Sequence, residues 1–155
     1  MQANTEIERK FLIDYLPAFV LDLVSTKIVQ GYLSRHNPTI RVRIENDSKA
    51  ILAIKSPPLD KEGRVRKEYE YEIPVEEAKE LIASYCGDNV VEKTRYLYCN
   101  EGKIWEVDVF VGRLSGLLLA EIELDIAEED FIKPDWIGRE VTSDPIYTNA
   151  YLAYA

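Results

Sequence analysis

Histidine and cysteine are almost absent from this 155-residue chain. There is one histidine, His36, and there are two cysteines, Cys86 and Cys99. A triad with histidine as its base and a zinc site built from histidine and cysteine are therefore nearly excluded. The cysteines lack a C-x-x-C spacing, so we interpret them as reduced thiols of a cytoplasmic protein, with one disulfide left open as the alternative.

Long apolar runs and nucleotide-binding signatures are also missing. No segment approaches the roughly 20 apolar residues that cross a bilayer, and residues 1–5 lack the basic-then-apolar pattern of a signal peptide. Neither a G-x-G-x-x-G motif nor a Walker A motif occurs, and no internal repeat is visible. We therefore expect a cytoplasmic protein without a membrane partner.

Positive charge is in the minority. The chain has 19 Lys and Arg against 28 Asp and Glu, a net charge of −9 at pH 7. A surface of this sign argues against general binding to nucleic acid or to anionic membranes. A local basic pocket remains compatible with it, so the positions of the cations matter more than their number.

The remaining composition is that of a globular domain. Hydrophobic residues make up 46% and charged residues 30% of the chain, and its length is that of about one domain. No linker is visible. We expect a single domain over residues 1–155, as a monomer or homodimer.

Charged and apolar residues alternate through most of the chain, which is the period of a β-strand. In the stretch from Ile40 to Glu45, three aliphatic side chains alternate with two arginines and a glutamate. A helix is expected at 17–23, an amphipathic helix at 75–85, and a helical or irregular tail at 127–155. The alternation predicts eight strands, mostly joined by hairpins, at 4–13, 27–34, 40–45, 50–55, 64–73, 90–99, 104–111 and 118–126.

Two α+β folds, both mainly antiparallel β, fit this pattern. In an open sheet, the charged faces would be the wet side and the apolar faces would pack on helices. In an eight-stranded closed β-barrel, the charged faces would line a polar interior, with the helices packed outside. That interior must be wet, paired or filled by a ligand, because burying one carboxylate costs several kcal/mol.

The charged faces indicate the ligand of such a barrel. Arginine forks match phosphate oxygens, and a set of seven cations suits a polyphosphate: Lys10, Arg41, Arg43, Lys55, Arg66, Lys93 and Arg95. Two E-x-E pairs, Glu6 with Glu8 and Glu121 with Glu123, come from the first and last predicted strands, which closure makes neighbours. Carboxylates without histidine or cysteine favour Mg²⁺ or Mn²⁺.

The sequence resembles the CYTH superfamily, the triphosphate tunnel metalloenzymes. The resemblance starts with Glu6-x-Glu8-x-Lys10 and covers nearly the whole chain in the order of the family. Its further motifs are Gly31-Tyr32-Leu33, Arg41-x-Arg43, Ile54-Lys55, Arg66-x-Glu68-x-Glu70, Lys93-x-Arg95-Tyr96, Trp105-Glu106-Val107-Asp108, Ala120-Glu121-Ile122-Glu123, the segment Trp136 to Thr142, and Tyr147-x-Asn149. One departure is Ser56-Pro57-Pro58 after Lys55, where many members have glycine.

The resemblance implies a triphosphate substrate and a divalent metal. It adds Asp108 to Glu6, Glu8, Glu121 and Glu123 as metal ligands, and it assigns the seven cations to phosphate binding. It suggests catalytic roles for four residues: Lys10, Tyr32, Glu68 and Glu70.

The expected activity is hydrolysis of inorganic triphosphate to pyrophosphate and phosphate. Small stand-alone members look most like this. The alternatives are an adenylate cyclase of the class IV type, a thiamine or nucleoside triphosphatase, and a polyphosphate-binding module without catalysis.

Overall fold

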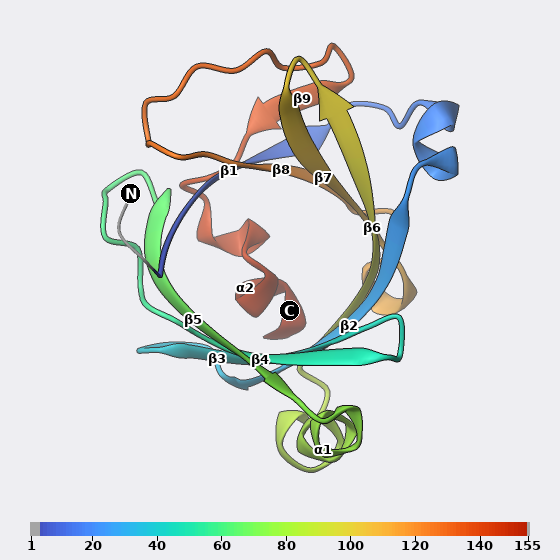
Figure 1. The fold of residues 1–155 in the computed structure, drawn as a ribbon, viewed down its shortest axis with the longest axis vertical. Helices are drawn as coiled ribbons and strands as arrows, with labels where there is room; N and C mark the ends of the chain where they lie inside the picture. Colours follow the sequence, from blue (N-terminus) through green and yellow to red (C-terminus); the bar gives the residue numbers. More distant parts are fainter. Residues whose placement is uncertain (1–3, 155) are drawn as a thin grey trace.

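The computed structural model describes residues 4–154 and shows a closed antiparallel β-barrel (Figure 1). Within these residues nine strands form one sheet, and eight of them close the barrel. The strands are β1 (Thr5–Ile13), β2 (Ser25–Ser34), β3 (Thr39–Glu45), β4 (Lys49–Lys55), β5 (Val65–Ile73), β6 (Val90–Asn100), β7 (Lys103–Phe110), β8 (Leu118–Glu123) and β9 (Ile137–Glu140). The closed barrel that the sequence predicts is confirmed, and the open sheet is excluded.

The first strand, β1, closes the ring and has neighbours on both edges. Around the barrel the order is β5-β4-β3-β2-β6-β7-β8-β1, and residues 5–7 of β1 pair back with β5. Residues 8–12 pair with β8. Further along, Phe11 and Ile13 pair with β9. Strand β9 thus lies on the same edge of β1 as β5, beyond the point where the pairing with β5 ends. The expectation of a helical or irregular tail was therefore wrong for 137–140.

Two apolar clusters cover the outside of the barrel. The larger one includes Phe11, Trp105 and Trp136, and its ring pair Phe11–Trp105 meets edge to face with centroids 5.5 Å apart. The other lies between β3, β4 and the helix α1 (Val75–Leu81), which buries Ala78 against Val42. These clusters place the apolar halves of the alternating strands outward, as predicted.

The C-terminal helix α2 (Asn149–Tyr154) lies inside the ring of strands (Figure 1). Its buried residues Leu152 and Ala153 pack with Phe110 and Leu119, which belong to the inward-facing sides of β7 and β8. Helices on the outside are thus correct for α1 but not for α2. One end of the interior is consequently an apolar plug, and only the rest is ionic.

The other helical segments are short. Residues expected as a helix at 17–23 form the 3₁₀ turn η1 (Ala18–Asp22), and α1 runs on into the π-helical turn η2 (Ile82–Cys86). Two further 3₁₀ turns are η3 (Gly112–Leu114) and η4 (Pro145–Tyr147). Over residues 4–154 no helix is both long and apolar enough to span a bilayer. Cys86 and Cys99 are free thiols, so the disulfide alternative is excluded.

Candidate active site

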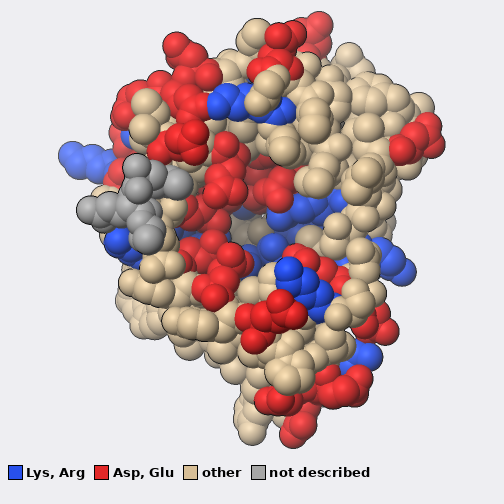
Figure 2. Space-filling view, viewed as in Figure 1, with Lys and Arg blue, Asp and Glu red and all other residues tan. Residues whose placement is uncertain are grey.

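A charged hollow opens at the centre of one face of the barrel (Figure 2), where acidic side chains surround more deeply placed basic ones. We call it the tunnel cavity; its volume is about 210 Å³. Eleven of its twelve lining residues are ionisable: Glu6, Glu8, Arg41, Arg43, Lys55, Glu68, Glu70, Arg95, Glu106, Glu121 and Glu123, with Asn149 as the twelfth. The charged strand faces therefore converge on one space.

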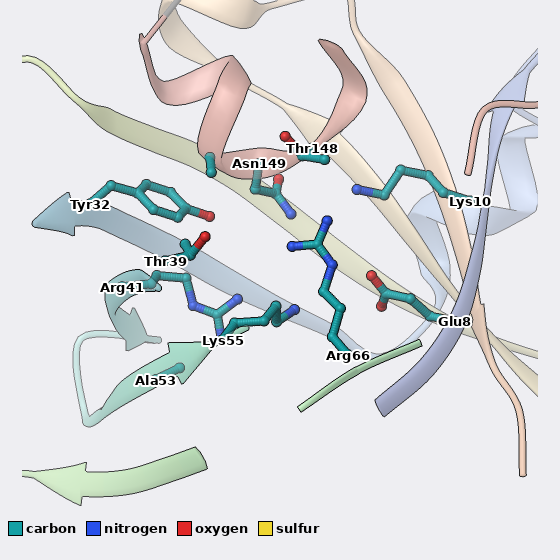
Figure 3. Close-up of a pocket in the computed structure, with 11 residues that line it drawn as sticks. Glu8, Lys10, Tyr32, Thr39, Arg41, Ala53, Lys55, Arg66, Thr148 and Asn149 are labelled. Carbon is teal, nitrogen blue, oxygen red and sulfur yellow. The ribbon is translucent and has the colours of Figure 1, made fainter. Parts of the chain in front are cut away.

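A smaller cavity adjoins it, and Figure 3 shows the side chains that line this second cavity. This inner cavity, of about 50 Å³, shares Glu8, Arg41, Lys55 and Asn149 with the tunnel cavity. It adds three residues that the sequence singled out, Lys10, Tyr32 and Arg66, and four that it did not, Thr39, Ala53, Thr148 and Ala150. The two cavities together form the candidate site.

Strand register explains why these side chains meet. On β1 and β8, Glu8 lies opposite Glu123 and Lys10 lies opposite Glu121. Residues directly opposite each other in an antiparallel pair point to the same side of the sheet. The two E-x-E pairs are therefore neighbours, as closure of the barrel predicts.

The basic side of the site has capacity for an anion. Arg41 Nε is buried and has no hydrogen-bond partner among the described residues, while its Nη2 lies 3.9 Å from Glu68 and 3.8 Å from Glu70. Within residues 4–154, Arg66 makes no ion pair, and Figure 3 shows its guanidinium pointing toward the same space as the Lys10 ammonium. A buried donor without an acceptor costs about 1–3 kcal/mol, which an anionic oxygen would recover.

Other cations are held in place by the barrel itself. Lys55 Nζ lies 2.9 Å from Glu6 and 3.5 Å from Glu68. Arg43 Nε donates to Gln30 Oε1 at 2.8 Å, and burial, aided by Arg41, lowers the pKa of Arg43 to about 10, which leaves it charged at neutral pH. These contacts fix cationic groups along the cavity wall.

The acidic side of the site is crowded. Burial raises the pKa of Glu8 to about 8, and the charges of Glu121 and Glu6 add to the effect. Burial and the charges of Glu6 and Glu70 likewise raise the pKa of Glu123. Carboxylates that repel one another in this way are stabilised by a shared cation, so the donor set fits a hard divalent metal.

The protein alone does not supply a complete metal shell. Within residues 4–154 no three carboxylate, histidine or cysteine side chains converge as a ready ligand group. Mg²⁺ is usually held by one or two carboxylates, with water and substrate phosphates in its other positions. The site therefore fits a metal ion whose coordination shell is completed by oxygens of a bound phosphate.

Asp108 and Lys93 lie behind the cavity wall and not on it. Asp108 Oδ2 is 2.7 Å from Lys93 Nζ, both side chains are buried, and Asp108 also accepts from Arg95 at 2.8 and 2.9 Å. Although burial opposes it, Lys93 and Arg95 lower the pKa of Asp108, and burial lowers the pKa of Lys93. In this structure Asp108 holds Arg95, a cavity cation, and neither Asp108 nor Lys93 lines the tunnel cavity or the inner cavity. Metal binding by Asp108 and phosphate binding by Lys93 stay predictions.

The C-terminal segment contributes residues to which the sequence reasoning gave no role. Lys10 Nζ donates to the carbonyl of Tyr147 at 3.0 Å, and Asn149 Oδ1 accepts from Lys93 at 3.2 Å while lining both cavities. The only signal for them was the Tyr147-x-Asn149 motif. Because the tail was expected outside the barrel, its polar residues could not be placed at the site.

A closed barrel with an ionic interior and an anion-ready arginine defines a tunnel-type anion-binding protein. The chain belongs to the CYTH domain family, whose sequence profile matches residues 4–148. It is 45% identical over 148 residues to an inorganic triphosphatase of Acetivibrio thermocellus, covering 95% of this chain and 92% of the relative. An inorganic triphosphatase of Nitrosomonas europaea is 39% identical over 153 residues, with 96% and 97% covered.

Solved structures agree with the fold. The crystal structure of the inorganic triphosphatase NE1496 superposes with a TM-score of 0.69 at 36% identity, covering 97% of this chain and 95% of that one. A Hippeastrum protein, described as a putative adenylyl cyclase with a dominant triphosphatase activity, has a TM-score of 0.59 at 20% identity and covers 79% and 81%. The second likeness supports the fold alone.

Proposed function

We propose that this protein hydrolyses inorganic triphosphate to pyrophosphate and phosphate in the tunnel, with a divalent metal. The observation that carries the proposal is the convergence of Arg41, Lys55 and Arg66 on one cavity, with the buried Arg41 Nε unpaired. The relatives named as inorganic triphosphatases support the choice of substrate.

The basic residues bind and orient the chain of phosphates. Arg41 presents a planar fork and Lys10 and Lys55 present point charges, so together they neutralise oxygens along the tripolyphosphate and hold it for in-line attack. Glu68 and Glu70, both within 4 Å of the Arg41 guanidinium, limit its rotation. Their catalytic contribution is therefore mainly the placement of Arg41.

The acidic residues supply the metal side of the proposal. One or two carboxylates of the set Glu6, Glu8, Glu121 and Glu123 would hold Mg²⁺ or Mn²⁺ together with substrate oxygens, and the metal would supply charge for the phosphoryl oxygens and a means of activating water. Glu121 is 3.4 Å from Lys10, and Lys10 in turn is fixed by the Tyr147 carbonyl. In this proposal the Lys10 ammonium, held beside Glu121, would contact the phosphate oxygens nearest the metal.

Turnover assays with tripolyphosphate, ATP and thiamine triphosphate test the proposal, each with Mg²⁺ and with Mn²⁺. We expect phosphate release from tripolyphosphate at a kcat/KM at least tenfold above that for either organic substrate, and none after chelation. Cyclic AMP as the main product from ATP, or binding of tripolyphosphate without turnover, would overturn it.

A further inference from the structure

A third cavity adjoins the inner cavity. This vestibule has a volume of about 490 Å³ and lies between three chain segments, at 35–39, 57–66 and 142–151. It shares Thr39, Arg66, Thr148 and Ala150 with the inner cavity. Its volume is within the range of small-molecule sites, and it adjoins the space where we place the phosphates.

The chain segments that form the walls of the vestibule are held by backbone hydrogen bonds. On one edge of β1, Glu8 N donates to the Arg64 carbonyl at 3.0 Å and the Lys10 carbonyl accepts from Val141 N at 2.8 Å. Pro57 and Pro58 follow β4 and have no N–H with which to extend the sheet. The vestibule is therefore bounded by fixed backbone and not by side chains alone.

Charge distinguishes the vestibule from the mouth of the tunnel. It is lined by Arg35, Lys61 and Arg66 against one carboxylate, Asp60. That carboxylate is already compensated, since it accepts from the side chain of Arg64 at 2.9 Å and from two backbone amides. The vestibule is therefore net positive and has hydroxyl donors.

The tunnel mouth has the opposite sign. The most exposed members of its lining include Glu70 and Glu123, with Glu106 also partly open to solvent. An anion leaving through this rim passes close to several carboxylates, whereas one leaving past Arg66 meets cations. Field differences of this kind set the local concentration of a charged ligand.

We propose that the vestibule is a second, weaker binding site for phosphate anions, joined to the tunnel through Arg66. It provides a second path by which phosphate or pyrophosphate leaves without crossing the acidic rim. This role in product release rests on the proposed function, while anion binding at the vestibule does not.

Calorimetric titration of the metal-free protein with pyrophosphate tests the site directly. We expect two classes of binding in the unmodified protein, a tighter one in the tunnel and a weaker one in the vestibule. Lys61 is exposed, so Lys61→Glu should fold normally and weaken the second class by about tenfold, with Lys61→Ala between the two. Lys49→Glu, the same change at an exposed position that lines neither cavity, is the matched control and should leave both classes intact.

The reciprocal variant separates the two sites. Arg41→Ala should weaken the tighter class and keep the weaker one, because Arg41 lines the tunnel and inner cavities but not the vestibule. A single class of binding in the unmodified protein, or equal titrations for Lys61→Glu and Lys49→Glu, would overturn the vestibule site. Two classes without tripolyphosphate turnover would instead overturn the proposed function and leave the vestibule standing.

Discussion

The Lys93 ammonium lies 2.7 Å from the Asp108 carboxylate, and both side chains are shielded from solvent. Removing one member of such a buried pair leaves an uncompensated charge and costs about 3–5 kcal/mol. Asp108→Asn should therefore lower the melting temperature by on the order of 10 °C in a chain of this size. Differential scanning calorimetry measures the change.

Glu106→Gln is the control for this prediction. Glu106 also pairs with Arg95, at 3.0 Å, but its side chain is 31% exposed, so its loss should cost at most about 1 kcal/mol. If Asp108→Asn and Glu106→Gln had the same melting temperature, the buried pair of Lys93 and Asp108 would not be what stabilises the fold.

The unpaired Nε of Arg41 predicts a large effect on binding. A hydrogen bond to a charged group contributes about 1.5–3 kcal/mol, so Arg41→Ala should weaken tripolyphosphate binding by roughly ten- to a hundredfold. Arg41→Lys restores the charge without the fork and should recover only part of the affinity. Arg139→Ala, at an exposed position, serves as the control in the same titration. An undiminished affinity of Arg41→Ala would remove this residue from the phosphate site.

The crowded carboxylates predict how activity depends on metal. Glu8→Gln removes a proposed ligand while keeping the size of the side chain, so it should lower turnover by more than about a hundredfold and raise the Mg²⁺ concentration needed for half-maximal rate. Glu72→Gln makes the same change at an exposed position outside the cavities and should be neutral. Equal Mg²⁺ titrations for the two variants would contradict the assignment.

The ion pair outside the barrel predicts a pH dependence of stability. Arg9 donates to Glu140 at 2.9 and 2.6 Å, and this hydrogen bonding lowers the pKa of Glu140, with burial opposing it. A carboxylate with a lowered folded-state pKa contributes stability above its unfolded pKa of about 4.3 and loses it as the pH falls through the folded value. Glu140→Gln should thus destabilise the protein at pH 7 by at most about 1 kcal/mol, because both groups are partly exposed.

Urea unfolding at pH 7 and at pH 3 measures this effect. The difference between Glu140→Gln and the unmodified protein should shrink at the lower pH, because the stability that comes from the lowered pKa of Glu140 is lost as the pH falls below its unfolded pKa and toward its folded pKa. A constant difference at both pH values would show that the charge of Glu140 is not what stabilises the fold.

The barrel could be predicted because its signal is local. Each strand carries its own alternation of charged and apolar residues. The side chains that face inward and outward are therefore set within five or six consecutive positions, as in the stretch from Ile40 to Glu45. The pairing of β1 with β8 then followed from closure, and it is confirmed by the opposed Glu8 and Glu123.

What could not be predicted depends on contacts between distant parts of the chain. Strand β9 has only four residues and exists because β1 has a free edge beyond β5. Helix α2 has an apolar surface that would suit either side of the barrel wall, and nothing in its sequence says that it enters the ring. Lys93 and Asp108 follow the same alternation as their neighbours in sequence. Only the packing of α2 against β6 shows that these two side chains are shielded from solvent.

The strand β1 pairs with β5, β8 and β9, which all follow it in the sequence. It is therefore the first strand of the barrel to be synthesised and among the last to gain all of its hydrogen-bond partners. Its ladder with β8 joins positions more than a hundred residues apart, such as Leu12 and Leu119. Such a high contact order implies slow folding, with the circle completed late. Chains that end before β8 should thus be unable to close the barrel. The unpaired edge of β1 would then be free to pair with the edge of another chain.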